Sequence, residues 1–262
     1  MVSVTRHLVQ FSTGAGSAEV AWRVVEKYGS SNVVLLTADT LVEDEDNWRF
    51  ASQVVDHLQC EWVRLSDGRT PLEVGRDLRV VPNNRMAVCS RVLKRELLRK
   101  HLDQNFDPAD SIVYLGFDWT EPERHERAVE PWRPWTIRSP LIEPPYVSKP
   151  DLLALFRDRG IEPPRLYSMG FSHANCGGAC VRGGQAQWEL LLRVNRPRYL
   201  EWEAGEAEIR SQLGKDVAIL RDRSGAVGRP LPLSVFRQRI DQQPDMFDDD
   251  DWGACGCSWD VE

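Results

Sequence analysis

The chain has 262 residues, of which 42% are hydrophobic and 28% charged, and its formal net charge is −7. This length and hydrophobic content suffice for one sizeable core, or for one core with a smaller appended lobe. No run approaches the roughly 18 consecutive apolar residues of a membrane span, so a membrane-embedded function is excluded and a cytoplasmic location is expected. The charge is uneven, because Asp216–Arg239 is rich in arginine while Asp248–Trp252 is acidic. A local arginine patch can receive phosphates, so an acidic chain does not exclude a nucleotide or nucleic-acid partner.

The first half of the chain alternates strand and helix signals. Short apolar or β-branched runs predict strands at His7–Phe11, Asn32–Thr40, Glu61–Asp67 and Ser111–Trp119. Helical spacing predicts helices between them, capped by Gly29 and Ser90, at Ala18–Gly29, Glu43–Leu58 and Ser90–Gln104. This alternation predicts an α/β fold with a doubly wound parallel sheet. Ligands bind beyond the carboxyl ends of such strands, so one rim is expected to hold the loops Ser12–Ser17, Asp39–Asp44 and Gly116–Glu121.

The second half has a different composition. Prolines cluster between Pro131 and Pro150, and a helix is predicted at Lys149–Gly160, with proline at its start and glycine at its end. After a glycine-rich segment, helical spacing continues from Gln185 to Gly214, and a hairpin is predicted around Asp222–Leu231. These signals divide the chain into a nucleotide-binding α/β domain (residues 1–145), a smaller, mostly helical lobe with the cysteine loop and the basic segment (146–240), and an acidic tail (241–262).

The turn FSTGAGS, residues 11–17, connects the first predicted strand to the first helix. Amides exposed at a helix N-terminus cradle phosphate, which makes candidates of Ser12, Gly14, Gly16 and Ser17. The turn lacks the Gly-Lys-Ser/Thr ending of a Walker loop and the glycine spacing of a dinucleotide fingerprint. A purely structural tight turn explains the same residues equally well.

Charged residues follow the second and fourth predicted strands. Asp39 ends the second strand, where a carboxylate binds a ribose hydroxyl or Mg²⁺, or merely caps the next helix; the sequence favours neither reading. The fourth strand is followed by Asp118 and Glu121, and then by Arg124 and Arg127 on one face of a predicted helix. Anion-binding arginines have this spacing, and so does a surface salt-bridge ladder.

Cys89 and Lys94 lie at the start of the helix predicted at Ser90–Gln104. Cations and a helix N-terminus lower the pKa of a neighbouring thiol, which would make Cys89 reactive or a ligand. The alternative is a buried cysteine on an apolar face, with its basic neighbours solvated.

The chain has six cysteines, which in a cytosolic protein are more often metal ligands, catalytic thiols or core residues than disulfides. The segment HANCGGAC, with Cys176 and Cys180, is hard to explain by packing, because core cysteines do not need glycine neighbours. Glycine lets the backbone wrap closely around an inorganic group, and three or four thiolates suit zinc or an iron–sulfur cluster. Metal ligation is therefore favoured over a redox disulfide, and both over core packing.

The favoured ligand set is Cys89, Cys176 and Cys180, with Cys257 or Cys255 of the C-terminal GACGC as the fourth. The C-x-x-x-C spacing differs from the C-x-x-C of a zinc ribbon. Whichever of the two tail cysteines is not a ligand is a candidate catalytic thiol. Cys60 precedes a strand in apolar surroundings and is expected to be structural.

Together these segments resemble the adenine nucleotide α-hydrolase (PP-loop) superfamily, and within it the iron–sulfur type of the phosphoadenosine phosphosulfate reductase-like proteins. The resemblance rests on FSTGAGS, VVLLTADTLVEDEDNWRF, CSRVLKREL, YLGFDWTEPERHERA and GFSHANCGGAC, which run in the expected order from about Phe11 to Cys180. It implies a fold that binds ATP or a related adenine nucleotide, with Mg²⁺, and members that adenylate a substrate or reduce a sulfonucleotide. Its iron–sulfur members hold a [4Fe–4S] cluster with three or four cysteines.

The chain departs from the family pattern at several positions. Ser12, Gly14 and Ser17 match a Ser-Gly-Gly-x-Asp-Ser loop, while Thr13 replaces its second-position glycine and Gly16 its aspartate. The C-terminal Cys-Gly-Cys does not match the Glu-Cys-Gly-Leu-His tail of the sulfonucleotide reductases. The pattern is more similar to the cluster-bearing relatives that place sulfur on DNA or RNA.

The resemblance implies a sulfur-transfer enzyme that acts on a nucleic acid or a nucleotide. Gly14–Ser17 would hold the phosphates of ATP, and Asp39 would meet the metal or ribose. Phosphate charge would be neutralised by Lys94, Arg124 and Arg127, and a sulfur donor protein would be a partner. Cys257 would be a ligand or a catalytic thiol, and assembly into a homodimer stays open. The alternatives are a sulfonucleotide reductase and a non-catalytic nucleotide-binding subunit.

Overall fold

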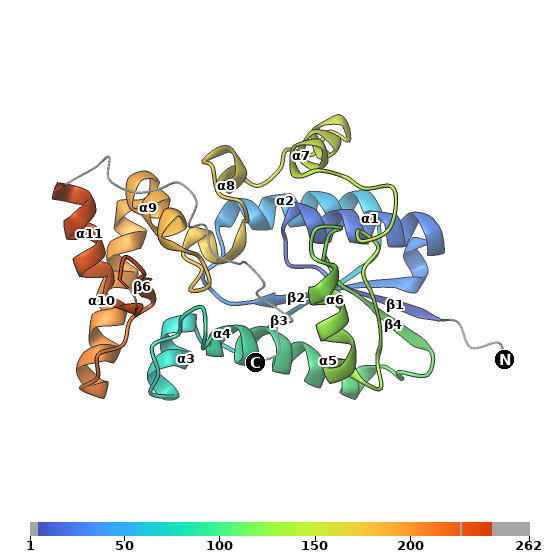
Figure 1. Ribbon diagram of the computed structural model, residues 1–262. Coiled ribbons are helices and arrows are strands. Elements are labelled where there is room, and N and C mark those ends of the chain that lie inside the picture. The colour runs from blue at the N-terminus through green and yellow to red at the C-terminus, as the bar shows by residue number, and fades with distance from the viewer. Residues whose placement is uncertain (1–4, 226, 243–262) are drawn as a thin grey trace.

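A computed structural model describes residues 5–225 and 227–242 (Figure 1). The predictions for Cys255, Cys257 and the acidic tail beyond Gln242 lie outside the described residues. In the first half the elements are β1 (Arg6–Gln10), α1 (Ala15–Tyr28), η1 (Ser30–Asn32), β2 (Val33–Asp39), α2 (Glu45–Leu58), β3 (Glu61–Ser66), α3 (Pro71–Asp77), α4 (Val88–Ser90), η2 (Arg91–Glu96), α5 (Leu97–Asn105) and β4 (Ser111–Tyr114). They are followed by α6 (Pro122–Val129), η3 (Glu130–Trp132), β5 (Thr136–Arg138), α7 (Lys149–Asp158), α8 (Arg165–Ser168), η4 (Asn175–Gly178), α9 (Gln185–Val194), α10 (Arg196–Leu213), β6 (Leu220–Asp222), β7 (Arg229–Leu231) and α11 (Leu233–Gln242).

Five parallel strands form the main sheet, in the order β3-β2-β1-β4-β5. The central strand β1 pairs with β2 on one side and β4 on the other, so that Val9 lies opposite both Leu35 and Tyr114. The order reverses at β1, and this is the point where a doubly wound sheet opens a crevice for ligands. The predicted α/β fold class is therefore confirmed.

Helices cover both faces of the sheet, as alternation along β1 requires. Val9 belongs to the core under α1, α2 and α7, together with Phe50 and Phe156. Leu8, the preceding residue, belongs to the opposite core, together with Leu102 of α5 and Ala128 of α6. Figure 1 shows α1, α2 and α7 on one side of the sheet and α5 on the other. Successive side chains of a strand point to opposite faces, so this central strand is buried on both.

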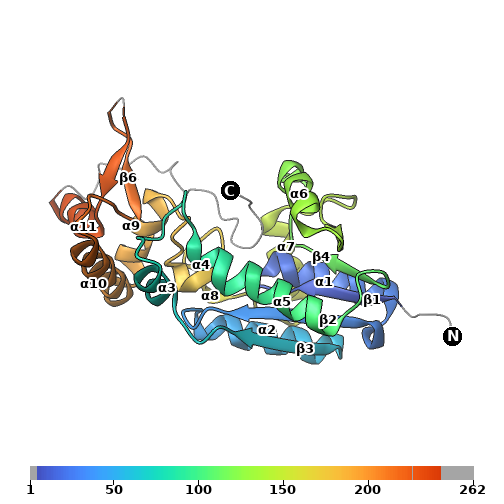
Figure 2. The same ribbon diagram turned by 90° about the horizontal axis from the view of Figure 1, so that it is seen from below.

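A second, mostly helical core lies at one end of the sheet, where α9, α10 and α11 lie side by side in both views (Figures 1 and 2). Its buried residues include Trp188 and Trp202, but also Val74 of α3 and Leu93 of η2 from the first half. Conversely, α7 packs with the sheet through Leu152 and Phe156. The hydrophobic cores thus cross the boundary expected between residues 145 and 146.

The helix starts follow local capping chemistry. Asp44 caps α2 by accepting a hydrogen bond from the Asp46 N–H, and Ser148 caps α7 by accepting one from the Asp151 N–H. Thr70 and Glu73 form a reciprocal capping box at α3. Among the described residues no helix is long and apolar enough to cross a membrane.

Several details differ from the sequence prediction, among them helices α3 and α8, which it does not include. The helix predicted from Ser90 begins at Val88 and continues into the π-helical turn η2, so Ser90 is not its N-cap. The fourth strand ends at Tyr114, after which Asp118 forms an isolated bridge to Leu141. The short strand β5 was not predicted, because only its central residue is buried and prolines lie on both sides. The predicted hairpin is confirmed as the antiparallel pair of β6 and β7.

Candidate functional site

A cavity of about 140 Å³ opens at the carboxyl ends of β1 and β4. It collects most of the residues predicted to bind nucleotide: Ser12, Gly14, Gly16, Ser17, Lys94, Asp118 and Arg124. Further lining residues come from the sheet, from α7, from α8 and from the cysteine loop: Gln10, Gly116, Phe117, Glu121, Leu141, Val147, Lys149, Leu152, Tyr167, His173, Ala174 and Asn175. We call this space the main cavity.

The β1–α1 turn forms one wall of the main cavity. Its backbone is stiffened by hydroxyl groups, because the Ser12 N–H donates to Ser17 Oγ at 3.1 Å and Ser17 Oγ donates to the Gly14 carbonyl at 3.0 Å. Helix α1 begins at Ala15, whose N–H donates to the Tyr167 hydroxyl at 3.2 Å. A polar oxygen thus already occupies one donor at the helix N-terminus, where an anion would be favoured.

Thr13 and Gly16, the two positions at which the turn differs from the Ser-Gly-Gly-x-Asp-Ser loop that it resembles, have different surroundings. Thr13 has a φ of +62°, a conformation that a β-branched residue adopts only under strain. Gly16 needs no glycine geometry: a Cβ there would lie 3.8 Å from the Gly116 carbonyl oxygen, its nearest neighbour. The structure therefore has room for a Cβ at position 16, where the loop that the turn resembles carries an aspartate.

Lys94 and Glu43 form a buried pair beside the turn. Lys94 Nζ lies 3.7 Å from Glu43 Oε1, and their side chains are 8% and 4% exposed. Glu43 also accepts hydrogen bonds from Thr40 Oγ1 at 3.0 Å and from the Cys176 N–H at 2.6 Å. Lys94 lines the main cavity and also a second, small cavity beside the cysteines. Lys94 is therefore shared by the two spaces, and Glu43 is its buried partner.

The small cavity, of about 20 Å³, is lined by Cys89, Cys176 and Cys180, and we call it the thiol cavity. A hydrogen bond to Cys180 and burial hold the pKa of the Cys176 thiol well above its ordinary value, an effect that nearby Lys94 opposes. The structure thus brings together the three predicted cysteines that it describes. Cys60 lies elsewhere, and burial raises the pKa of its thiol to about 11, which agrees with a structural role.

The glycines of the cysteine loop serve packing between protein groups. A Cβ on Gly177 would approach the Arg198 guanidinium to 2.6 Å, and one on Gly178 would meet the Phe171 ring at 2.8 Å. Both glycines have positive φ, and so does Cys176. The inference that glycine makes room for an inorganic group therefore needs correction, because Arg198 and Phe171 occupy that room.

The cysteines fit a thiol-liganded metal by their chemistry, since soft thiolates suit zinc and iron–sulfur clusters. Within residues 5–225 and 227–242, however, no three Cys, His, Asp or Glu residues are gathered closely enough to hold a metal ion. The fourth predicted ligand, Cys255 or Cys257, lies outside that part of the chain. The donor set therefore fits a thiol-liganded metal in kind, but the described residues do not form a complete ligand set.

Two predicted nucleotide-binding residues lie away from the main cavity. Asp39 is buried and bonds Arg64 at 2.6 Å, and it also accepts the Leu41 N–H at 2.8 Å. The Arg64 guanidinium in turn stacks on Trp48, 3.6 Å from the ring centroid. Arg127 is exposed on α6, and its guanidinium donates to a backbone carbonyl of its own helix. Arg124, by contrast, lines the cavity and pairs with Glu121.

The arginines of the predicted basic segment are largely engaged within the helical lobe. Arg237 pairs with Glu203 at 2.8 Å, and Arg239 with Asp222 at 2.7 Å. The Arg221 guanidinium donates to the Gly228 carbonyl. A nucleic-acid backbone would have to compete with these internal partners.

An exposed aromatic pair stands beside the main cavity. Trp119 and Tyr146 are 46% and 59% exposed, and their ring centroids are 5.8 Å apart. Each directly adjoins a lining residue, since Asp118 precedes the tryptophan and Val147 follows the tyrosine. Large exposed aromatic surfaces at a cavity rim are typical of ligand contact.

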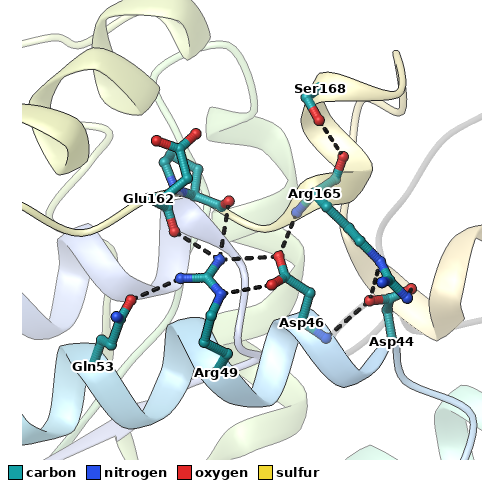
Figure 3. A network of polar contacts seen from close by, with 8 residues as sticks. Asp44, Asp46, Arg49, Gln53, Glu162, Arg165 and Ser168 are labelled. Carbon is teal, nitrogen blue, oxygen red and sulfur yellow. Dashed lines mark hydrogen bonds and ion pairs between the residues drawn. The ribbon is translucent and has the colours of Figure 1, made fainter.

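A polar network fastens α8, and with it Tyr167, to the start of α2 (Figure 3). Asp46 accepts from Arg49 at 2.6 Å and from the Arg165 N–H at 2.7 Å, while the Arg165 guanidinium bonds Asp44 at 2.9 Å. Arg49 also donates to the Glu162 carbonyl at 2.9 Å. The network positions one wall of the main cavity.

Sequence reasoning missed Gln10, Glu43, Lys149 and Tyr167. Glu43 reads as a first-turn acid of a helix, and Tyr167 lies in a stretch with no motif. Gln10 carried a usable signal, because it is a polar residue in a strand whose other central residues are apolar.

No protein-family model and no curated protein matches the sequence. Solved structures of several enzymes resemble this one. One is a phosphoadenylyl-sulfate reductase of Candida auris in a phosphate complex, which is 11% identical over 66% of this chain and 80% of that chain, with a TM-score of 0.42. Another is the U34-tRNA thiolase NcsA of Methanococcus maripaludis with its [4Fe–4S] cluster, which is 14% identical over 61% of this chain and 58% of that chain, with a TM-score of 0.45. A third is an NH3-dependent NAD synthetase of Campylobacter jejuni, which is 15% identical over 80% of this chain and 84% of that chain, with a TM-score of 0.38. The chain spans little more than half of the thiolase. At TM-scores below 0.5 these similarities do not assign a function.

Proposed function

We propose that this protein is a nucleotide-dependent sulfur-transfer enzyme that adenylates an oxygen of its acceptor. The observation that carries the proposal is the position of Lys94, which lines both the main cavity and the thiol cavity. A cationic side chain between a phosphate-binding turn and a set of thiols suits a reaction in which a nucleotide and sulfur meet. The pair with Glu43 keeps that side chain buried and oriented.

The main cavity supports binding of an adenine nucleotide through its phosphates. The α1 N-terminus and the hydroxyls of Ser12 and Ser17 would contact phosphate oxygens. Lys94, Arg124 and Lys149 would offset the charge that develops as pyrophosphate leaves. If Mg²⁺ takes part, the carboxylates that line the cavity within the described residues are Asp118 and Glu121. Asp39 would have to release Arg64 before it could join them.

In the proposed reaction an acceptor oxygen attacks the α-phosphorus of ATP, and the bond to pyrophosphate breaks. A sulfide sulfur from a donor then bonds the activated carbon, and AMP leaves with the original oxygen. No electron is gained or lost in these two displacements.

Cys89, Cys176 and Cys180, with one tail cysteine as the fourth ligand, would hold a [4Fe–4S] cluster. When bound, such a cluster supplies an iron site that binds sulfide. The protein would contribute a small pocket whose lining includes Lys94 and the buried Trp202. The Glu43 carboxylate, which accepts the Cys176 N–H, would fix the loop that carries two of the thiols.

The exposed pair of Trp119 and Tyr146 supports a nucleic acid as the acceptor. Bases stack on exposed aromatic rings whatever their sequence, and this pair stands beside the cavity where activation would occur. Lys149 and Arg124 line the same cavity and would attract the phosphate backbone. An acceptor as small as a single nucleotide would not need an aromatic surface outside the cavity.

The test is a reaction under anaerobic conditions with ATP, a labelled sulfide source and single-stranded DNA or RNA. The proposal expects pyrophosphate release that depends on the oligonucleotide, and label in the product. The Lys94→Met variant should lose both the pyrophosphate release and the label in the product. The matched control is Lys100→Met on the same helical stretch, which should keep both. ATP binding without pyrophosphate release would contradict the proposal and favour a non-catalytic nucleotide-binding subunit.

A second candidate is a sulfonucleotide reductase. The hydrogen-bonded thiols of Cys176 and Cys180 favour it, because two adjacent thiols can supply two electrons and form a disulfide. Release of sulfite from a sulfonucleotide, with loss of two titratable thiols, would identify this activity. Sulfur incorporation into an oligonucleotide without sulfite release would exclude it.

A further inference from the structure

We infer that Gln10 is a ligand-binding residue whose side-chain amide donates a hydrogen bond to a phosphate or sulfate oxygen in the main cavity. The inference rests on the proposed function, since it places an anionic group of the nucleotide between the β1–α1 turn and Lys94. Nothing in the sequence motifs assigns Gln10 a role.

Gln10 is the last residue of β1 and points to the same sheet face as Leu8, where the core is apolar. Its strand partner is Leu36, which is also buried. An apolar residue would therefore satisfy the fold at this position. Gln10 is only 6% exposed, and within the described residues neither its amide nitrogen nor its amide oxygen has a hydrogen-bond partner.

A buried polar group without a partner destabilises a fold, and such groups call for an explanation beyond packing. For Gln10 the explanation is the position of its side chain. Gln10 lines the main cavity and also a separate narrow cavity of about 20 Å³, and it shares both with Ser12 and Lys94. Its side chain therefore lies next to the space beside the phosphate-binding turn.

The charges around this space select an anion. Lys94, Arg124 and Lys149 line the main cavity, and the α1 N-terminus adds its partial positive charge. Two carboxylates line the same cavity: Glu121 pairs with Arg124, and Asp118 accepts from the Thr120 N–H at 2.8 Å, so the lining cations outnumber the lining carboxylates by one. An amide N–H of Gln10 would complete a set of donors around a tetrahedral oxyanion. The oxyanion could belong to the nucleotide or be a separate sulfate, and the two sources have the same chemistry.

The test compares Gln10→Leu with the wild-type chain in two measurements. Titration calorimetry with ATP, pyrophosphate and sulfate gives the affinities, and urea unfolding without ligand gives the stability. Loss of a hydrogen bond to a charged oxygen should weaken binding by about 10- to 100-fold. Removal of an unpartnered buried amide should leave the unliganded protein as stable as the wild type, or more stable.

Gln187→Leu is the matched control for stability. Gln187 is equally buried, at 4% exposure, but its Nε2 donates to the Gly178 carbonyl at 2.8 Å, so its loss should destabilise the chain. A destabilised Gln10→Leu protein would show that Gln10 is structural and would overturn the inference. Gln10→Glu, which adds a negative charge, should weaken binding further; tighter binding would mean that the residue faces a cation, and would also overturn it.

The outcomes separate this inference from the proposed function. If wild type and Gln10→Leu bind every probe equally well, Gln10 is not a ligand-binding residue, while the nucleotide cavity stands. If the wild type binds none of the three probes, the proposed function and the inference both fail. A weaker affinity for ATP and pyrophosphate alone identifies the nucleotide as the source of the oxyanion, and a weaker affinity for sulfate alone identifies a separate anion.

Discussion

Glu206 provides a stability prediction with a defined pH window. This residue of α10 joins the hairpin to the last helix, because its carboxylate oxygens accept the Ile219 N–H and the Leu233 N–H, each at 2.7 Å. The side chain is 2% exposed. Burial outweighs the two hydrogen bonds and raises the pKa of Glu206 from an ordinary value of 4.5 to about 7.

The direction of the effect follows from proton binding. Between the two pKa values the folded chain keeps the Glu206 proton while the unfolded chain releases it, so unfolding becomes more favourable as the pH rises. The stabilisation is complete below pH 4.5 and is lost as the pH passes through about 7. A difference of about 2.5 pKa units corresponds to roughly 3 kcal/mol of unfolding free energy.

The assay is urea unfolding of wild type and Glu206→Gln at a series of pH values from 4.5 to 8. Glutamine cannot ionise, so the difference between the two proteins removes the titration of all other groups. The unfolding free energy of the wild type minus that of Glu206→Gln should fall by about 3 kcal/mol from pH 4.5 to pH 8. The variant should be less stable at pH 4.5, because one backbone N–H faces an amide N–H instead of an oxygen. A difference that does not change with pH would refute the reasoning.

Three further predictions concern the main cavity and its walls. Gly16→Asp should change the unfolding free energy by less than about 1 kcal/mol, because the Cβ has room and a carboxylate is favourable at a helix N-terminus. The same substitution should make ATP binding depend on Mg²⁺, which calorimetry with and without EDTA measures. Asp46→Asn should cost about 1–2 kcal/mol in urea unfolding, because the half-buried carboxylate loses charge-assisted bonds including that to the Arg165 N–H; an unchanged midpoint would show that the network adds no stability. Trp119→Ala should weaken binding of a single-stranded oligonucleotide by about 5-fold or more in fluorescence anisotropy and leave ATP affinity unchanged, whereas the equally apolar but distant Leu200→Ala should change neither.

The fold could be predicted because its signals are local. Buried runs such as Asn32–Thr40 read as strands on their own, and strict alternation with helices leaves few topologies other than a parallel sheet. Strand β5, one of the elements that the sequence does not predict, has a single buried residue at Ile137 and forms a strand by pairing with β4. The helical lobe's core was also hidden, because Val74 and Trp202 meet only through tertiary packing.

The candidate site could be predicted where residues form motifs, and not where they form pairs. The turn with Ser12 and the cysteine loop with Cys176 are each a single continuous stretch of sequence, and each lines a cavity. The contact between Glu43 and Lys94 joins segments that α2, β3 and α3 separate in the chain, and no pattern in either segment predicts it. Asp39 is the reverse case. Its position at the end of a strand suggests a ligand-binding carboxylate, but in the structure it forms an ion pair with Arg64.

The central claim is that thiols next to a nucleotide cavity handle sulfur. The most direct test is to purify the full chain without oxygen and to count iron, zinc and sulfide in wild type, Cys176→Ala and Cys60→Ala. The account predicts about four irons with matching sulfide in wild type and in Cys60→Ala, and their loss in Cys176→Ala. A single zinc, or the same metal content in all three proteins, would contradict it and leave the cysteine loop as a structural feature of the helical lobe.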